Sequence, residues 1–286
     1  MQSVSASGIL QNFAPAFWRD HHFGLPKVRW ARLDGKSFWI TGAGTGYGRS
    51  ISLALAAAGA RVFISGRRTE KLHETLAEGI SLGIDISRCI PVPVDITLES
   101  DLARATEAIR QFTPHLYGLV NSAALPQPVV GPYPLADQSA AAWTDLLTTN
   151  VTGPWLTSKA ALPLMEKGDG FRVVFLSSEA GWAATSGFGP YNVSKSAVNT
   201  LGASLAAECA RKYLGKDVQI NVLVPGEART EMNQGSTESP YSVVSMVLIL
   251  LSHPSGGPNG CFFHRDGRHL AFAYSQAYPQ NLLVVR

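Results

Sequence analysis

The 286-residue chain is poor in cysteine and has no long hydrophobic run. Its three cysteines, Cys89, Cys209 and Cys261, are too dispersed for a disulfide framework, and no Cys-x-x-Cys motif occurs. This usage is typical of a reducing, intracellular setting. The longest apolar run, residues 243–251, is too short to cross a bilayer, and the N-terminus lacks the pattern of a signal peptide. We therefore expect a cytoplasmic protein without a transmembrane segment.

Charge is also scarce: 16% of the residues are charged and the net charge is +3. The basic residues are scattered along the chain, so we expect no nucleic-acid partner. The seven histidines form no metal-binding pattern, since His264 and His269 are five positions apart with no carboxylate framework around them. We expect no metal site. What is abundant is hydrophobic sequence, 45% of the chain, which is enough for a sizeable core.

Residues 36–267 alternate between two kinds of segment. Apolar strands are predicted at 37–41, 61–65, 90–94, 116–121, 171–177, 218–224 and 261–264, and helices at 47–58, 69–82, 100–112, 139–165, 192–213 and 241–251. Apolar strands that alternate with helices indicate a parallel sheet buried on both faces. Right-handed crossovers then give an α/β fold with a doubly wound, Rossmann-like sheet. No linker interrupts this alternating pattern, so we assign residues 34–267 to a single domain, the catalytic domain.

Two extensions flank this domain. Residues 1–33 form an N-terminal arm in which aromatic and charged residues are interleaved without a clear period. We expect the arm to pack on its own domain or on a neighbouring subunit; a docking segment for a partner or a membrane surface is the alternative. Residues 268–286 form a C-terminal extension with Tyr274, Tyr278 and Pro279, which is predicted to cover a site or a subunit contact.

A glycine-rich loop follows the first predicted strand and precedes the first predicted helix. The loop runs Thr41-Gly42-Ala43-Gly44-Thr45-Gly46-Tyr47-Gly48. Glycines let the backbone turn sharply and let a pyrophosphate approach closely, and the helix N-terminus offers unpaired N–H groups to it. The loop between a strand and a helix therefore predicts a dinucleotide site.

The end of the second strand favours one dinucleotide over the other. NAD-binding folds commonly place an acidic residue here for the ribose 2′-hydroxyl, whereas this chain has Gly66 followed by Arg67 and Arg68. A guanidinium suits a 2′-phosphate, so we expect NADP(H) rather than NAD(H), with Arg67 as the ligand. Arg67 and Arg68 as a solvated pair that opens the next helix are the alternative.

Two further strand ends carry polar residues. Asp95 is placed to accept a hydrogen bond from an adenine amino group, and Asn121 to meet the adenosine ribose. Both are also ordinary turn residues at strand ends.

Tyr191 and Lys195 are four residues apart on a predicted helix and therefore share one face of it. A unit charge about 4 Å from the phenol, at an effective dielectric near 20, contributes roughly 4 kcal/mol. We expect Lys195 to lower the pKa of Tyr191 toward neutrality, which makes the phenol a usable proton donor or acceptor. Ser178 lies thirteen positions upstream, and its neighbour Ser177 competes for the same role.

Together, the loop, the strand ends and the Ser178, Tyr191 and Lys195 set resemble the short-chain dehydrogenase/reductase family over residues 36–267. The resemblance implies that Tyr191 is the general acid or base, that Lys195 lowers its pKa and holds the nicotinamide ribose, and that Ser178 binds the substrate oxygen. It also implies that Asn150 holds a water in the proton relay behind Lys195. The implied cofactor residues are Gly42, Thr45, Gly46, Tyr47, Gly48, Arg67, Asp95, Asn121, Tyr191, Lys195, Pro225, Gly226 and Thr230.

The sequence departs from the family pattern at the substrate side. Tyr47 stands where the family has isoleucine, and the segment after Thr230 is short for a substrate lid. Ser178, Trp182 and Glu227 are the candidate substrate residues, and the carboxylate of Glu227 favours a polar, sugar-like alcohol or ketone.

Other functions stay open. A 3-oxoacyl or other hydrophobic ketone is the alternative substrate, and a non-catalytic NADP-binding sensor or scaffold is the alternative function. By resemblance we expect a homodimer or homotetramer built on the helices near 139–165 and 192–213.

Overall fold

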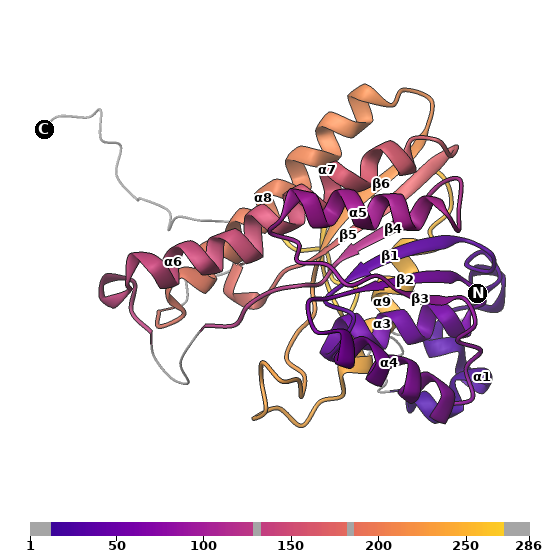
Figure 1. The fold of residues 1–286 in the computed structure, drawn as a ribbon, viewed down its shortest axis with the longest axis horizontal. Helices are drawn as coiled ribbons and strands as arrows, with labels where there is room; N and C mark the ends of the chain where they lie inside the picture. The colour runs from indigo at the N-terminus through magenta and orange to yellow at the C-terminus, as the bar shows by residue number, and fades with distance from the viewer. Residues whose placement is uncertain (1–12, 128–132, 182–185, 272–286) are drawn as a thin grey trace, which may run out of the picture.

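The computed structural model describes residues 13–127, 133–181 and 186–271. Within these ranges the strands form one parallel sheet in the order β3-β2-β1-β4-β5-β6-β7 (Figure 1). The strands are β1 (Ser37–Thr41), β2 (Arg61–Ser65), β3 (Cys89–Pro91), β4 (Gly118–Asn121), β5 (Gly170–Leu176), β6 (Asp217–Val224) and β7 (Phe262–His264). The order reverses between β1 and β4, which is where sheets of this type bind ligands. The doubly wound, Rossmann-like fold is confirmed.

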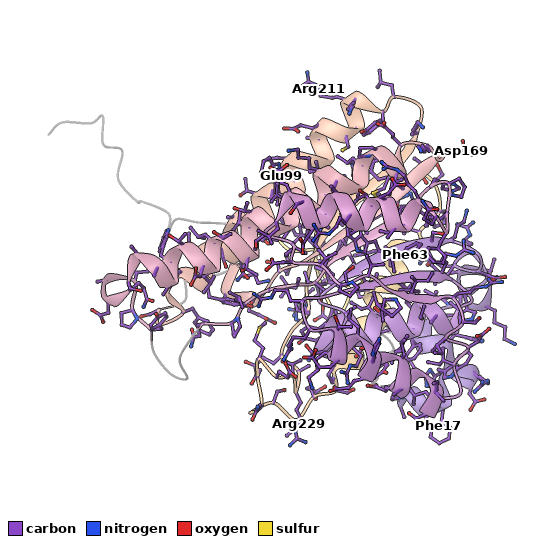
Figure 2. All side chains as sticks on the ribbon, in the orientation of Figure 1. Phe17, Phe63, Glu99, Asp169, Arg211 and Arg229 are labelled. Carbon is purple, nitrogen blue, oxygen red and sulfur yellow. The ribbon has the colours of Figure 1, made fainter. Side chains whose placement is uncertain are left out.

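Helices cover both faces of the sheet (Figure 1). They are α3 (Gly46–Ala57), α4 (Thr69–Ser81), α5 (Glu99–Arg110), α6 (Ala140–Leu147), α7 (Gly153–Met165), α8 (Gly189–Lys212) and α9 (Val244–Leu251). One core joins the sheet to α3 and α9, and a second core joins its other face to α5, α7 and α8. Phe63 of β2 is fully buried, whereas Glu99, Asp169 and Arg211 lie at the rim of the molecule (Figure 2). In the described ranges no helix is long and apolar enough to cross a membrane.

Several element boundaries differ from the prediction for local chemical reasons. β3 ends at Pro91 instead of residue 94, although Val92 and Val94 still donate to the β2 side, to Ile64 O and Gly66 O. Pro91 and Pro93 lack an N–H group and interrupt the regular pattern. α8 begins at Gly189, three residues before the predicted start, with Pro190 in its first turn.

The predicted long helix at 139–165 is divided into α6, a π-helical turn at Thr148–Thr152 and α7. Pro154 in the first turn of α7 has no N–H to continue the preceding ladder. Such π turns are frequent at functional sites, and this one holds Asn150.

The described part of the N-terminal arm packs on its own domain. It consists of short helical turns at Pro15–Phe17, Trp18–His21 (α1), His22–Gly24 and Lys27–Trp30 (α2). Phe23 is fully buried in the core that contains α9, and its ring stacks on that of Tyr241 with 5.8 Å between centroids. The Trp18 indole donates to Leu82 O at 3.1 Å. These contacts bear out the expected packing on its own domain.

Candidate active site

A cleft of about 500 Å³ opens at the carboxyl ends of β1, β2, β3 and β4. The predicted cofactor residues that line it are Gly42, Thr45, Gly46, Tyr47, Arg67, Asp95 and Thr230. Arg68, Lys71, Thr149, Glu231 and Met232 line it as well, together with residues 122–126. The remaining predicted cofactor residues, Gly48, Asn121, Tyr191, Lys195, Pro225 and Gly226, do not line this cleft.

The glycine loop leaves room where side chains would fill it. Gly42 has φ +66°, and an added Cβ would lie 2.8 Å from the Ala123 backbone. Gly46 has φ +50°, and an added Cβ would lie 3.0 Å from the Thr230 methyl group. Gly48 serves packing instead, since an added Cβ would lie 2.3 Å from Gly42 O. The loop is a cradle that only small residues allow, and it fits the close approach of a pyrophosphate.

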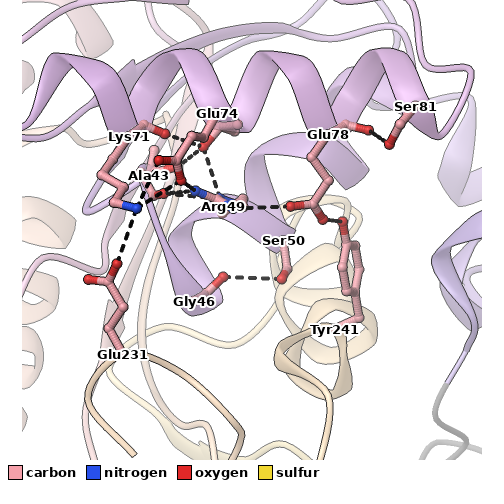
Figure 3. Close-up of polar contacts among 12 residues, drawn as sticks. Ala43, Gly46, Arg49, Ser50, Lys71, Glu74, Glu78, Ser81, Glu231 and Tyr241 are labelled. Atoms are coloured by element: carbon pink, nitrogen blue, oxygen red, sulfur yellow. Dashed lines mark hydrogen bonds and ion pairs between the residues drawn. The ribbon is translucent and has the colours of Figure 1, made fainter. Parts of the chain in front are cut away.

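A network of polar side chains from α3 and α4 holds the glycine loop in place (Figure 3). Arg49 of α3 donates to Gly44 O at 3.0 Å and forms ion pairs with Glu74 (3.1 Å) and Glu78 (3.3 Å) of α4. Glu78 in turn accepts from the Tyr241 hydroxyl at 2.7 Å. The network joins the loop to α4 and to the 3₁₀ turn Pro240–Val243 that precedes α9, so the loop is held by charge as well as by packing.

Asp95 and Asn121 each have a structural partner. The Asp95 carboxylate accepts from the backbone N–H (3.0 Å) and the hydroxyl (2.7 Å) of Thr97, which closes the turn after β3, and Asp95 still lines the cleft. Asn121 is buried and donates to Ser158 Oγ at 3.1 Å. Its side-chain oxygen has no hydrogen-bond partner among the described residues. A buried acceptor without a donor is costly, and this oxygen does not face the cleft in the structure.

The structure brings Ser178, Tyr191 and Lys195 together. The Ser178 hydroxyl is hydrogen-bonded to the Tyr191 phenol. The buried Lys195 ammonium lies 5.6 Å from the centre of the Tyr191 ring and donates to Leu176 O at 3.0 Å. Ser177 points elsewhere, because its hydroxyl donates to Asn199 Oδ1 at 2.6 Å. Of the two competing serines, Ser178 is therefore the one beside the phenol.

The expected lowering of the Tyr191 pKa is wrong for this structure. Burial raises the pKa of Tyr191 to about 12; the Ser178 hydrogen bond opposes this rise, and the Glu179 charge adds to it. Lys195 does not supply the expected counter-effect, because its ammonium is directed at Leu176 O. Burial also lowers the pKa of Lys195 to about 8. Low polarity around the buried Lys195 and the partly buried Tyr191 disfavours both charged forms.

Asn150 ties the loop after β4 to the start of α8. It is buried, its side-chain oxygen accepts from Leu125 N at 2.7 Å, and its amide donates to Leu125 O (3.0 Å) and to Ser194 Oγ (3.2 Å). Ser194 in turn donates to Tyr191 O at 2.7 Å. Asn150 therefore positions the backbone that carries Tyr191.

Tyr47 joins the glycine loop to the segment after β6. Its hydroxyl donates to Gly226 O at 2.6 Å. Burial raises the pKa of Tyr47; the Arg265 charge opposes the rise, and Glu179 and Tyr191 add to it, so Tyr47 lies near the catalytic set. Arg265 braces the other side by donating to Glu227 O and to Ser242 Oγ, both at 2.9 Å. Sequence reasoning missed Arg265, whose only signal was its place just after the last predicted strand.

The substrate side differs from the prediction in its carboxylate. Glu227 is exposed and is held through its backbone, whereas Glu179 is the carboxylate whose charge acts on Tyr191. Glu179 lies 3.4 Å from His264 Nε2, and Asp266 lies 2.8 Å from His264 Nδ1. Glu179 comes close to His264 because β5 and β7 end at the same edge of the sheet, whereas Asp266 follows His264 by two residues in the chain. In the described part of the chain these side chains form no group that could hold a metal ion. Trp182 lies outside the described residues.

The fold and the cleft define a dinucleotide-binding α/β protein of the Rossmann type. Residues 36–240 match the model of the short chain dehydrogenase family. The chain belongs to the short-chain dehydrogenase/reductase family and is an oxidoreductase of that family.

Relatives span most of the chain. It is 30% identical over 229 residues to the dehydrogenase/reductase SDR family member 4 of Pongo abelii, covering 80% of this chain and 79% of the relative. It is 29% identical over 209 residues to the chloroplastic NADPH-dependent aldehyde reductase 2 of Arabidopsis thaliana, covering 70% and 75%. A short chain dehydrogenase from Escherichia coli CFT073, solved in complex with NADPH, superposes with a TM-score of 0.74 at 25% identity, covering 84% of this chain and 99% of that one.

Proposed function

We propose that the protein is an NADP(H)-dependent oxidoreductase that interconverts a ketone or aldehyde and an alcohol, with Tyr191 as the general acid and base. The observation that carries the proposal is the contact of Ser178 with Tyr191, with the Lys195 ammonium 5.6 Å from the ring centre. These three residues lie on the sheet edge that also holds the glycine cradle.

The residues divide the chemistry among them. In reduction, the Tyr191 phenol donates its proton to the carbonyl oxygen, while Ser178 donates a hydrogen bond to the same oxygen and stabilises the charge that develops there. The nicotinamide, when bound, supplies the hydride. Lys195, whose ammonium lies 5.6 Å from the centre of the Tyr191 ring, would hold the nicotinamide ribose. Asn150 holds the start of α8 in place and takes the relay position behind Lys195.

The cofactor would occupy the cleft beside the glycine loop. Gly42, Thr45, Gly46 and Tyr47 would hold the pyrophosphate and Asp95 the adenine, since all five line the cleft. Asn121, at the end of β4, is the candidate for the adenosine ribose, although its side chain does not line the cleft. Pro225, Gly226 and Thr230 would border the nicotinamide half. Arg67 favours NADP over NAD, as does the absence of an acidic residue at Gly66. The E. coli structure with NADPH and the NADPH-dependent Arabidopsis reductase support this preference.

A polar carbonyl compound, such as a sugar derivative, is the proposed substrate class. Glu179 supports it, because a carboxylate beside the catalytic set accepts hydrogen bonds from substrate hydroxyls. A homo-oligomer in the cytoplasm stays a prediction from family resemblance and cysteine usage.

The test is NADPH oxidation followed by absorbance across a panel of aldehydes, ketones and keto-sugars, with Tyr191→Phe as the inactive control. Turnover of keto-sugars is expected. Turnover of hydrophobic ketones alone would overturn the substrate class, and no turnover of any carbonyl compound with binding intact would favour a sensor or scaffold.

A further inference from the structure

An acidic side chain forms ion pairs with the basic side chains that border the proposed adenosine end of the cleft. Glu231, in the segment after β6, is 2.6 Å from the Arg68 guanidinium through one carboxylate oxygen. Its other oxygen is 3.7 Å from the Lys71 ammonium (Figure 3). All three line the cleft with Arg67. One carboxylate thus joins the two sides of the cleft mouth.

The segment that carries Glu231 is placed by its own contacts. Thr230 and Asn233 exchange backbone hydrogen bonds of 3.1 and 3.2 Å, and Asn233 N also donates to Thr230 Oγ1. The Thr230 methyl group stands over Gly46 of the glycine loop. This turn directs the Glu231 side chain toward α4. Arg229, two residues before Glu231, is labelled at the edge of the molecule in Figure 2 and locates the segment there.

A carboxylate and a phosphate monoester take the same donors, namely guanidinium and ammonium groups. A 2′-phosphate bound beside Arg67 would meet Arg68 and Lys71 already paired with Glu231, and the two anions would repel each other. Lys71 is also paired with Glu74 at 2.8 Å, so its ammonium contacts two carboxylates, those of Glu74 and Glu231.

Resting on the proposed function, we propose that Glu231 is an internal competitor for the ribose 2′-phosphate of the cofactor. It occupies Arg68 and Lys71 in the free protein, and the phosphate must displace it. Glu231 then weakens the preference for NADP over NAD, and its release frees the segment after β6 from the cleft mouth.

Adenosine 2′,5′-bisphosphate and adenosine 5′-monophosphate are the probes, because they differ only in the 2′-phosphate and require no turnover. Isothermal titration would compare the wild-type protein with Glu231→Gln. Exposed ion pairs contribute up to about 1 kcal/mol, which corresponds to about a five-fold change in affinity. We expect Glu231→Gln to bind the bisphosphate about three- to five-fold more tightly and the monophosphate unchanged.

Glu99→Gln is the matched control. Glu99 is an exposed carboxylate at the start of α5 that pairs with Lys159 at 3.2 Å and does not line the cleft. We expect its effect on both probes to stay below about two-fold.

The outcomes separate the two proposals. If the wild-type protein prefers the bisphosphate and Glu231→Gln leaves that preference unchanged or weakens it, the competitor role is overturned while the NADP assignment stands. Equal gains for Glu99→Gln and Glu231→Gln, or equal gains for both probes, also overturn it. If neither protein prefers the bisphosphate, both proposals fail. A stronger preference in Glu231→Gln alone supports the competitor role.

Discussion

Lys195 carries a buried charge that should cost the folded state stability, and Lys195→Met tests this. The pKa of Lys195 is 10.5 in the unfolded chain and about 8 in the folded protein. At about 1.4 kcal/mol per pKa unit, keeping the ammonium buried at pH 7 costs roughly 3 kcal/mol. Methionine of similar length removes that cost but leaves Leu176 O without its donor, a loss of about 1 kcal/mol. We expect Lys195→Met to be more stable than the wild type by roughly 2 kcal/mol at pH 7.

The pH dependence gives this prediction a sign. Between pH 8 and 10.5 the unfolded chain holds the Lys195 proton and the folded protein releases it. The unfolded state then binds more protons, so wild-type stability rises with pH across that window. The variant lacks this contribution, and its advantage should shrink from pH 8 upward and be lost by about pH 10.

Urea unfolding of both proteins at pH 7 and pH 9.5 measures the difference. Lys212→Met on the same helix, 67% exposed, is the control and should change stability by less than about 0.5 kcal/mol. A variant less stable than the wild type at pH 7, or an advantage that does not depend on pH, would refute the reasoning.

Three further substitutions test other parts of the site and the fold. Tyr191→Phe should lower kcat at least about 100-fold while NADPH affinity stays within about two-fold, and kinetics that stay near wild type would exclude the phenol as the proton donor. Arg67→Ala should weaken adenosine 2′,5′-bisphosphate about ten-fold and leave adenosine 5′-monophosphate unchanged, as titration would measure, and equal losses for both would remove Arg67 as a phosphate ligand. Phe23→Ala should destabilise the fold by about 3–5 kcal/mol in urea unfolding, because the ring is fully buried, whereas exposed Phe17→Ala should change it little.

The sheet and the glycine loop were predictable because their signals are local. Strands that are apolar on both faces, separated by helices, leave few alternatives, and a glycine loop between a strand and a helix identifies its own ligand class. The spacing of Tyr191 and Lys195 likewise predicted a shared face of α8, which the structure confirms.

What the sequence could not provide depends on contacts between distant segments. The bond from Tyr47 to Gly226 joins residues 179 positions apart, and the pairing of Arg68 with Glu231 spans 163 positions. The Tyr191 pKa was mispredicted for the same reason: the spacing to Lys195 is visible in the sequence, but the burial that dominates the pKa is not. The π turn at Asn150 also escaped, since hydrophobic periodicity does not distinguish one extra residue per turn.

A continuous chain of side-chain contacts links the N-terminal arm to the glycine loop. Phe23 stacks on Tyr241, whose hydroxyl donates to Glu78, and Glu78 holds the Arg49 that donates to Gly44 O. Thermodynamic reciprocity makes any coupling through these contacts equal in both directions: if ligand binding at the loop strengthens the docking of the arm, loosening the arm weakens ligand affinity by the same free energy. With such coupling, protease cleavage within residues 13–33 would slow when a ligand binds in the cleft. The N-terminal arm, which is not part of the sheet, would then report whether the site at the carboxyl ends of the strands is occupied.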